Sequence, residues 1–70
     1  MRLTLNGKPR DVAVEAARLT VAELARRLEL PAMIVVERNG EIVDRECFAE
    51  TALADGDVLE IVVMVGGGSR

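Results

Sequence analysis

The sequence predicts an α+β domain in which one helix packs on one face of a mixed β-sheet. Three observations support this prediction: alternating apolar residues at the N-terminus, an amphipathic segment with a helix-start signal after residue 19, and a long β-branched run before the last glycines. A chain of 70 residues forms one domain at most, and half of its residues are hydrophobic, which suffices for one small core.

The N-terminal segment is expected to form a β-hairpin. Apolar and polar residues alternate over 1–6, as they do in a strand with one buried face. Asn6-Gly7 follows, and it is the strongest two-residue hairpin signal because both positions tolerate positive φ. The second strand is expected over about 9–14, on an edge of the sheet, because Pro9 has no N–H to donate.

A helix is predicted over 21–29. Thr20 is a suitable N-cap, and Glu23 lies three residues later, where its carboxylate can return a hydrogen bond to the cap and complete a capping box. The apolar residues of the segment share one helix face and the charged ones share the other. Pro31 is expected to end the helix.

The second half of the chain is expected to supply three strands. The apolar run 33–36, the turn signal Asn39-Gly40 and the returning segment 41–43 predict a second hairpin. A turn or short helical connection is expected over 44–53. The segment 58–65 is the longest β-branched stretch, so it is predicted to be the central strand, beside the first one.

This order of elements is the β-grasp, or ubiquitin-like, architecture: two strands, a helix, two strands, a short connection and a last strand. We expect residues 1–65 to form the β-grasp domain and residues 66–70 to form a flexible, glycine-rich C-terminal tail.

The composition argues against an enzyme. The chain has one Phe and no His, Trp or Tyr, so the usual proton shuttle of active sites is missing. The single cysteine, Cys47, excludes an internal disulfide and a CxxC metal pair, and it suits a reducing cytoplasm. Cys47 is a candidate for thiol chemistry, but an incidental or semi-buried cysteine is the simpler interpretation. Asp55 and Asp57 flank Gly56 and are interpreted as turn residues, not as metal ligands.

The charge pattern bears on partners. The net charge is −3, and residues 31–70 carry three basic and eight acidic side chains. This balance disfavours nucleic acid and favours a partner with a basic surface. A membrane span needs about 20 apolar residues, and the sequence has no such run.

The last strand is expected to present an unusual outward surface. Its alternation points residues 59, 61 and 63 toward the helix and leaves four residues facing outward: Val58, Glu60, Val62 and Met64. Three of these four are apolar, where a solvated sheet face normally carries polar side chains. They predict a partner-docking face. The alternative is that Val62 and Met64 are merely strand formers, partly covered by neighbours.

The whole chain resembles the ThiS family, the sulfur carrier proteins of thiamine biosynthesis. The resemblance rests on MRLTLNGKPR, LTVAEL, VERNGEIVDRECF and LADGDVLEIVVMVGGG, and above all on their order and spacing. It implies a protein that is not an enzyme and binds no cofactor. An adenylating enzyme of the ThiF type would use ATP to activate the carboxylate of its C-terminal Gly-Gly, and a cysteine desulfurase would supply sulfur for a thiocarboxylate. A thiazole synthase of the ThiG type would then take that sulfur.

The resemblance places the terminal glycine pair on Gly67 and Gly68, with Gly66 before them. The departure is Ser69-Arg70, because an internal glycine has no carboxylate to adenylate. We expect a protease to remove these two residues and leave Gly68 terminal; the alternative is that they derive from a cloning vector. Read without the resemblance, the glycines are a frayed end or an engineered linker.

Two other functions remain open. One is a related ubiquitin-like sulfur carrier, either of the MoaD type for molybdopterin or one that serves tRNA thiolation or cysteine synthesis. The other is a non-covalent β-grasp binding module, whose glycines are only a tail.

Overall fold

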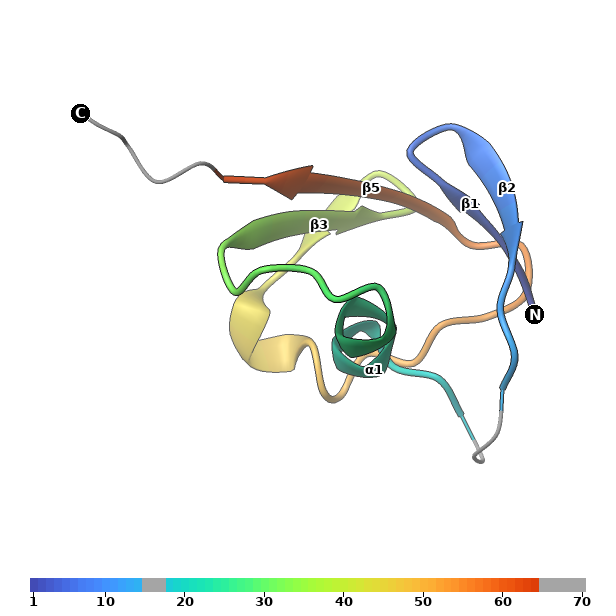
Figure 1. Cartoon of the computed structure of the whole chain (residues 1–70), viewed down its shortest axis with the longest axis horizontal. Coiled ribbons are helices and arrows are strands. Elements are labelled where there is room, and N and C mark those ends of the chain that lie inside the picture. The colour runs from blue at the N-terminus through green and yellow to red at the C-terminus, as the bar shows by residue number, and fades with distance from the viewer. Residues whose placement is uncertain (15–17, 65–70) are drawn as a thin grey trace.

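The computed structural model describes residues 1–14 and 18–64 (Figure 1). Its elements, in chain order, are β1 (Arg2–Leu5), β2 (Lys8–Asp11), α1 (Val21–Arg27), β3 (Ile34–Arg38), β4 (Glu41–Val43), the 3₁₀ helix η1 (Arg45–Cys47) and β5 (Val58–Val63). The five strands form one sheet in the order β2-β1-β5-β3-β4, and α1 covers one of its faces. This is the β-grasp architecture that the sequence predicts.

The last strand lies in the middle of the sheet, as predicted. β5 runs parallel to β1 on one side and antiparallel to β3 on the other. It is shorter than expected in the described residues, because the strand ends at Val63 and Met64 adds one further backbone bond, to the Met33 carbonyl at 2.9 Å. β5 therefore joins the two hairpins into one sheet.

Both Asn-Gly pairs form the predicted hairpin turns. The φ angles are 50° and 84° at Asn6 and Gly7, and 52° and 87° at Asn39 and Gly40. Two successive residues with positive φ are the signature of a type I′ turn, whose twist matches that of the flanking strands. Each turn sets the register of its hairpin.

The second strand lies on an edge of the sheet, as the sequence predicts from Pro9. Its bounds differ from the expected 9–14, because the strand runs from Lys8 to Asp11. The pairing starts immediately after the two-residue turn, with Leu5 opposite Lys8, and so reaches Asp11 opposite Arg2 at the start of β1. The strand therefore includes Pro9 and ends opposite the residue at which β1 begins.

The helix begins as predicted. The Thr20 hydroxyl accepts a hydrogen bond from the N–H of Glu23 at 3.1 Å. The predicted return bond from Glu23 to the cap is wrong, because the Glu23 carboxylate accepts hydrogen bonds from Arg26 and Arg27 instead. These two arginines lower the pKa of Glu23 to about 2.

The helix ends earlier than Pro31 would require. Leu28 is its C-cap, and Glu29 adopts a left-handed conformation with φ of 56°. The N–H groups of Glu29 and Leu30 then bond back to the carbonyls of Arg26 and Ala25, at 3.1 and 3.0 Å. This is a Schellman ending, which normally has glycine at the left-handed position. The chain has thus already left the helix before it reaches the proline.

The core lies between α1 and the inner face of the sheet. Its eight buried apolar residues are Leu3, Leu19, Val21, Leu24, Ile34, Val36, Leu53 and Leu59. Leu59, from the central strand, is completely inaccessible to solvent. Phe48 is only partly buried, at the margin of this cluster. Burying these aliphatic side chains stabilises the fold chiefly through the hydrophobic effect.

Candidate functional site

The sheet face opposite α1 carries an exposed apolar surface. The alternation of β5 places Leu59 in the core and turns its neighbours in the sequence outward. Val58, Val62 and Met64 are 44%, 59% and 50% exposed, and Glu60 is also exposed. The structure thus leaves uncovered the residues that the sequence predicts to face outward.

The neighbouring strands enlarge this surface. Val35 lies opposite Val62, and Glu37 lies opposite Glu60, in the register of β3 with β5. Ile42 of β4 lies opposite Glu37 and is 65% exposed. We call these seven residues the outer face: Val35, Glu37, Ile42, Val58, Glu60, Val62 and Met64.

Three members of the outer face come from β3 and β4 and were not among the residues predicted from the sequence. Their signal was present, because the Asn39-Gly40 turn fixes the register of Ile42 with Glu37. Once β3 is paired with β5, the same alternation sends Val35 and Glu37 outward. The pairing of β3 with β5 joins residues far apart in the chain, so alternation within one segment does not predict it.

Two carboxylates interrupt the outer face. Glu37 and Glu60 are directly opposite each other on neighbouring strands. Like charges in this position destabilise a sheet. A cationic side chain of a partner would relieve that repulsion, so the pair gives the outer face a preference for a basic partner.

Val63 has its predicted orientation but is not buried. It lies opposite the buried Ile34, so it points toward the helix side as predicted, but it is 45% exposed. In Figure 1 the end of β5 extends past α1, so the helix does not cover this part of the sheet. The end of β5 is therefore accessible to solvent on both faces of the sheet.

A buried carboxylate fixes the start of β5. Asp57 is 6% exposed and accepts hydrogen bonds from Arg38 Nε at 2.9 Å, Asn39 Nδ2 at 3.0 Å and the Ala54 N–H at 2.8 Å. Burial is the largest single influence on its pKa and raises it, but the hydrogen bonds from Arg38, Ala54 and Asn39 outweigh burial and lower the pKa overall. The bond with Ala54 confirms the predicted role of Asp57 in the turn.

Asp55 also serves the fold. Its Oδ1 accepts a hydrogen bond from the backbone N–H of Arg2 at 2.6 Å, which joins the turn before β5 to the first strand. Across residues 1–14 and 18–64 there is no group of three His, Cys, Asp or Glu side chains that could hold a metal ion.

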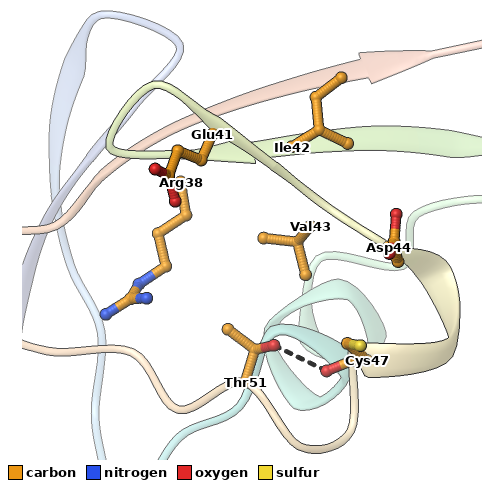
Figure 2. Close-up of a pocket in the computed structure, with 7 residues that line it drawn as sticks. All are labelled: Arg38, Glu41, Ile42, Val43, Asp44, Cys47 and Thr51. Carbon is orange, nitrogen blue, oxygen red and sulfur yellow. Dashed lines mark hydrogen bonds between the residues drawn. The ribbon is translucent and has the colours of Figure 1, made fainter.

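Cys47 lies in η1 and is exposed, not semi-buried. Figure 2 shows it at the margin of an open depression, below β4 and beside Thr51, whose hydroxyl donates to the Cys47 carbonyl at 2.7 Å. In the same view Val43 points into the depression and Ile42 points to the other side of the strand. Cys47 is thus on the opposite side of the sheet from the outer face.

The glycine tail and its predicted reaction site lie outside the described residues. This applies to Gly66, Gly67 and Gly68 and to the two residues after them, Ser69 and Arg70. The outer face ends at Met64, two residues before the first glycine of the tail. In the part of the chain that is described, no helix is both long and apolar enough to span a membrane.

Comparison with known proteins gives consistent results. The model of the ThiS family matches residues 3–68. The sulfur carrier protein ThiS of Bacillus subtilis is 43% identical over 67 residues, which cover 94% of this chain and 98% of that protein. A thiazole synthase of Paramagnetospirillum magneticum is 43% identical over 70 residues, but this chain spans only 21% of its length.

Solved structures agree with this result. The crystal structure of the thiamine biosynthesis protein (ThiS) from Geobacter metallireducens has 43% sequence identity and a TM-score of 0.81, covering 97% of this chain and all of that one. A solution structure of a thiamine biosynthesis protein from the same organism has a TM-score of 0.79, covering all of this chain and 91% of that one. The fold, the identity over nearly the full length and the family match through residue 68 together establish that this chain belongs to the ThiS family.

Proposed function

We propose that this protein is a sulfur carrier of thiamine biosynthesis, acting in the cytoplasm as a co-substrate and not as a catalyst. The observation that carries this proposal is the 43% identity to a sulfur carrier protein ThiS, which extends over 98% of that protein. The family match also runs through Gly68 and stops before Ser69. The matched region therefore extends over Gly66, Gly67 and Gly68.

The reaction site is the α-carboxylate of Gly68. One of its oxygens attacks the α-phosphate of ATP, pyrophosphate leaves, and an acyl adenylate forms. Sulfide then attacks the carbonyl carbon and displaces AMP, which leaves a thiocarboxylate; when the sulfur arrives as a persulfide, the same attack leaves an acyl disulfide, and a thiol must reduce its S–S bond to release the thiocarboxylate. The chain supplies a slim acyl donor, because glycine has no Cβ to obstruct a narrow active site. The ThiF-type adenylating enzyme binds the ATP and supplies the catalysis, and a cysteine desulfurase supplies the sulfur.

Removal of Ser69 and Arg70 is a precondition for this chemistry. While they are attached, the Gly68 carbonyl belongs to an amide, which offers no free oxygen for adenylation. We propose that a protease exposes Gly68. The vector origin of the two residues would lead to the same mature form, with Gly68 as the last residue.

The acceptor of the sulfur is a thiazole synthase of the ThiG type. A thiazole synthase of another organism carries a stretch that resembles this chain along 21% of its length, which supports a functional link between such a carrier and that enzyme. Docking to both enzymes uses the outer face, whose apolar residues Val58, Val62 and Met64 flank Glu60 on β5.

Intact mass spectrometry tests the proposal. Three forms are compared: the full chain, the chain ending at Gly68, and a control ending at Val65, which lacks all three glycines. Each is incubated with a ThiF-type enzyme, ATP and sulfide, and the expected result is a mass gain equal to one oxygen replaced by sulfur, in the Gly68 form alone. The enzyme is shown to be active on its own carrier in parallel.

The other outcomes are equally informative. A gain in the full chain would contradict the need for processing. No gain in any form, with an active enzyme, would favour the non-covalent binding module. Sulfur loading followed by failure to support thiazole formation, while another thiocarboxylate-dependent reaction proceeds, would favour the MoaD type or another related carrier.

A further inference from the structure

The two outer edges of the sheet are protected against pairing with another strand. β2 reads Lys-Pro-Arg-Asp, so it combines three charges with a proline that cannot donate. β4 has only three residues, begins with Glu41 and is followed by Asp44. Short edge strands, charges and proline are the usual means by which proteins prevent edge-to-edge association.

A third edge lies inside the sheet, along the end of β5. The neighbouring strand β1 stops at Leu5, where the chain turns away through Asn6 and Gly7. The Asn6 side chain takes the place of one more strand residue, because its Nδ2 donates to the Ile61 carbonyl at 3.1 Å and its Oδ1 accepts from the Ile61 N–H at 2.7 Å. Among the described residues, no strand lies beside β5 on this side beyond Ile61 (Figure 1).

The register shows which backbone groups this leaves free. Met64 donates to the carbonyl of Met33 in the direction of β3, so the backbone groups of Val62 also point to β3 and those of Val63 point the other way. Ile61 has the same orientation as Val63, and its N–H and carbonyl are the ones that Asn6 binds. Within residues 1–14 and 18–64, the N–H and carbonyl of Val63 have no hydrogen-bond partner.

This inner edge lacks the protection of the other two. Its residues are Val62, Val63 and Met64, all apolar and 59%, 45% and 50% exposed. There is no proline or charge among them, and β-branched residues favour strand pairing. The chain thus protects its outer edges and leaves open the one that leads to the tail.

We propose that the open edge at Val63 pairs with an extended segment of the enzyme that adenylates the tail, which thereby adds a strand to this sheet. This inference rests on the proposed function, because it assigns the occupant through the tail that begins three residues later. Main-chain hydrogen bonds to Val63 would fix the direction in which the chain leaves the domain, and such pairing is a known mode of peptide recognition.

The acidic charge of residues 31–70 favours the enzyme over a second copy of this chain as the occupant of the edge at Val63. Residues 31–70 carry three basic and eight acidic side chains, so two copies paired at Val63 would bring two acidic halves together. The segment that fits has small or apolar residues beside Val62 and Met64 and basic residues near Glu60.

Amide hydrogen exchange of the ¹⁵N-labelled carrier, free and with excess ThiF-type enzyme, tests the proposal. In the free carrier we expect the Val63 amide to exchange quickly and the Val62 amide, which is directed to β3, to be protected. On binding, the Val63 amide should slow by about tenfold or more, because a new hydrogen bond must open before exchange.

A pair of variants tests the same bond independently. Val63→Pro removes the backbone N–H and replaces the valine side chain. Val63→Ala also replaces the valine side chain but keeps the N–H. The proline variant should bind the enzyme about tenfold more weakly than the alanine variant, which is the effect of one lost hydrogen bond. The amide spectrum of each variant shows whether it is folded, and the exchange measurement on the unaltered chain does not depend on either variant.

The outcomes separate this inference from the proposed function. If the carrier binds and is loaded with sulfur while Val63 exchanges as fast as before, the edge pairing is wrong and the carrier function stands. Protection of Val63 in the carrier alone, with a doubled mass in sedimentation, would identify a second copy as the occupant and overturn the proposal. If neither binding nor loading occurs, the proposed function fails, and the assigned occupant fails with it.

Discussion

The side-chain amide of Asn6 forms two hydrogen bonds with the backbone of Ile61, fifty-five residues away in the sequence. Asn39 also binds the backbone of β5, on the other side of that strand, where its Oδ1 accepts a hydrogen bond from the N–H of Val58 at 2.9 Å. Both residues hold positive φ in their turns. Each asparagine therefore has two functions, to shape a hairpin and to bind the central strand.

Replacement of Asn6 separates these two functions. Asn6→Gly keeps the positive φ and loses both bonds to Ile61, and we expect it to cost about 1–2 kcal/mol of unfolding free energy. Asn6→Ala also strains the turn and should cost about 1 kcal/mol more. Urea denaturation measures both. Equal stability of Asn6→Gly and the unaltered chain would show that the bonds to Ile61 contribute nothing net.

Asp57→Asn should destabilise the fold by about 1–3 kcal/mol. The variant keeps the shape of the side chain, but its amide cannot accept every bond that Arg38, Asn39 and the Ala54 N–H now donate. Asp11→Asn is the matched control, because Asp11 pairs with Arg2 at the surface and its loss should leave the urea midpoint nearly unchanged. Similar midpoints for the two variants would contradict the structural role of Asp57.

The stability contributed by Asp57 should depend on pH. Its pKa is lowered in the folded state, so the contribution is complete above the unfolded-state pKa of about 4 and is lost as the pH falls through the folded-state value. The difference in unfolding free energy between the unaltered chain and Asp57→Asn should therefore shrink on acidification below about pH 4. Urea titrations at a series of pH values measure it, and a constant difference would exclude an ionised Asp57 as the cause.

Glu29→Gly should stabilise the protein by up to about 1 kcal/mol, because Glu29 occupies the left-handed position of the helix ending, where glycine pays no steric cost. Glu29→Ala removes the same carboxylate without relieving the backbone, so it serves as the control. The thermal unfolding midpoint of the glycine variant should be higher than that of the unaltered chain. The midpoint of the alanine variant should be equal to or lower than that of the unaltered chain. The reverse order would mean that the Glu29 side chain makes a contribution larger than the strain.

Val62→Asp should reduce sulfur loading by about tenfold or more, because it places a charge in the middle of the outer face. Val14→Asp is a suitable control, since Val14 is an exposed valine that is not part of the outer face. The amide spectra of both variants should show a folded domain. Equal loading of the two would remove Val62 from the docking surface.

Glu60→Lys should have opposite effects on fold and function. It replaces the like-charge pair of Glu37 and Glu60 with an opposite-charge pair, so the thermal midpoint should not fall. Adenylation should slow by about tenfold, because a basic partner would now meet a positive charge. An unchanged rate of pyrophosphate release would place Glu60 outside the interface.

Much of the architecture follows from local signals. The two Asn-Gly turns predict both hairpins, and the Thr20 cap predicts where α1 begins. The β-branched run predicts that β5 is the central strand, and the sheet order places it between β1 and β3. These features depend on a few neighbouring residues, which is why the sequence alone reveals them.

The features that could not be predicted from the sequence depend on contacts between residues that are distant in the chain. Nothing near Asn6 indicates that its side chain binds Ile61, and nothing near Asp57 indicates the bond from Arg38. The helix end was misplaced because Pro31 is a visible stop signal, whereas a glutamate in the left-handed conformation of Glu29 is not. Only part of the outer face was predicted. Alternation within the last segment predicts its members from 58 to 64, whereas those from β3 and β4 depend on strand pairing.

The parallel arrangement of β1 and β5 has a mechanical consequence. The chain enters the sheet at the start of β1 and leaves it at the end of β5, so tension between these two ends is applied along both strands in opposite directions (Figure 1). The bonds from Thr4 to Asp57, from Asn6 to Leu59 and between the Asn6 side chain and Ile61 are then loaded together, in shear. Resistance to such a force depends on the unfolding rate. When the domain is pulled between these two ends, these bonds must therefore break together before β5 separates from β1.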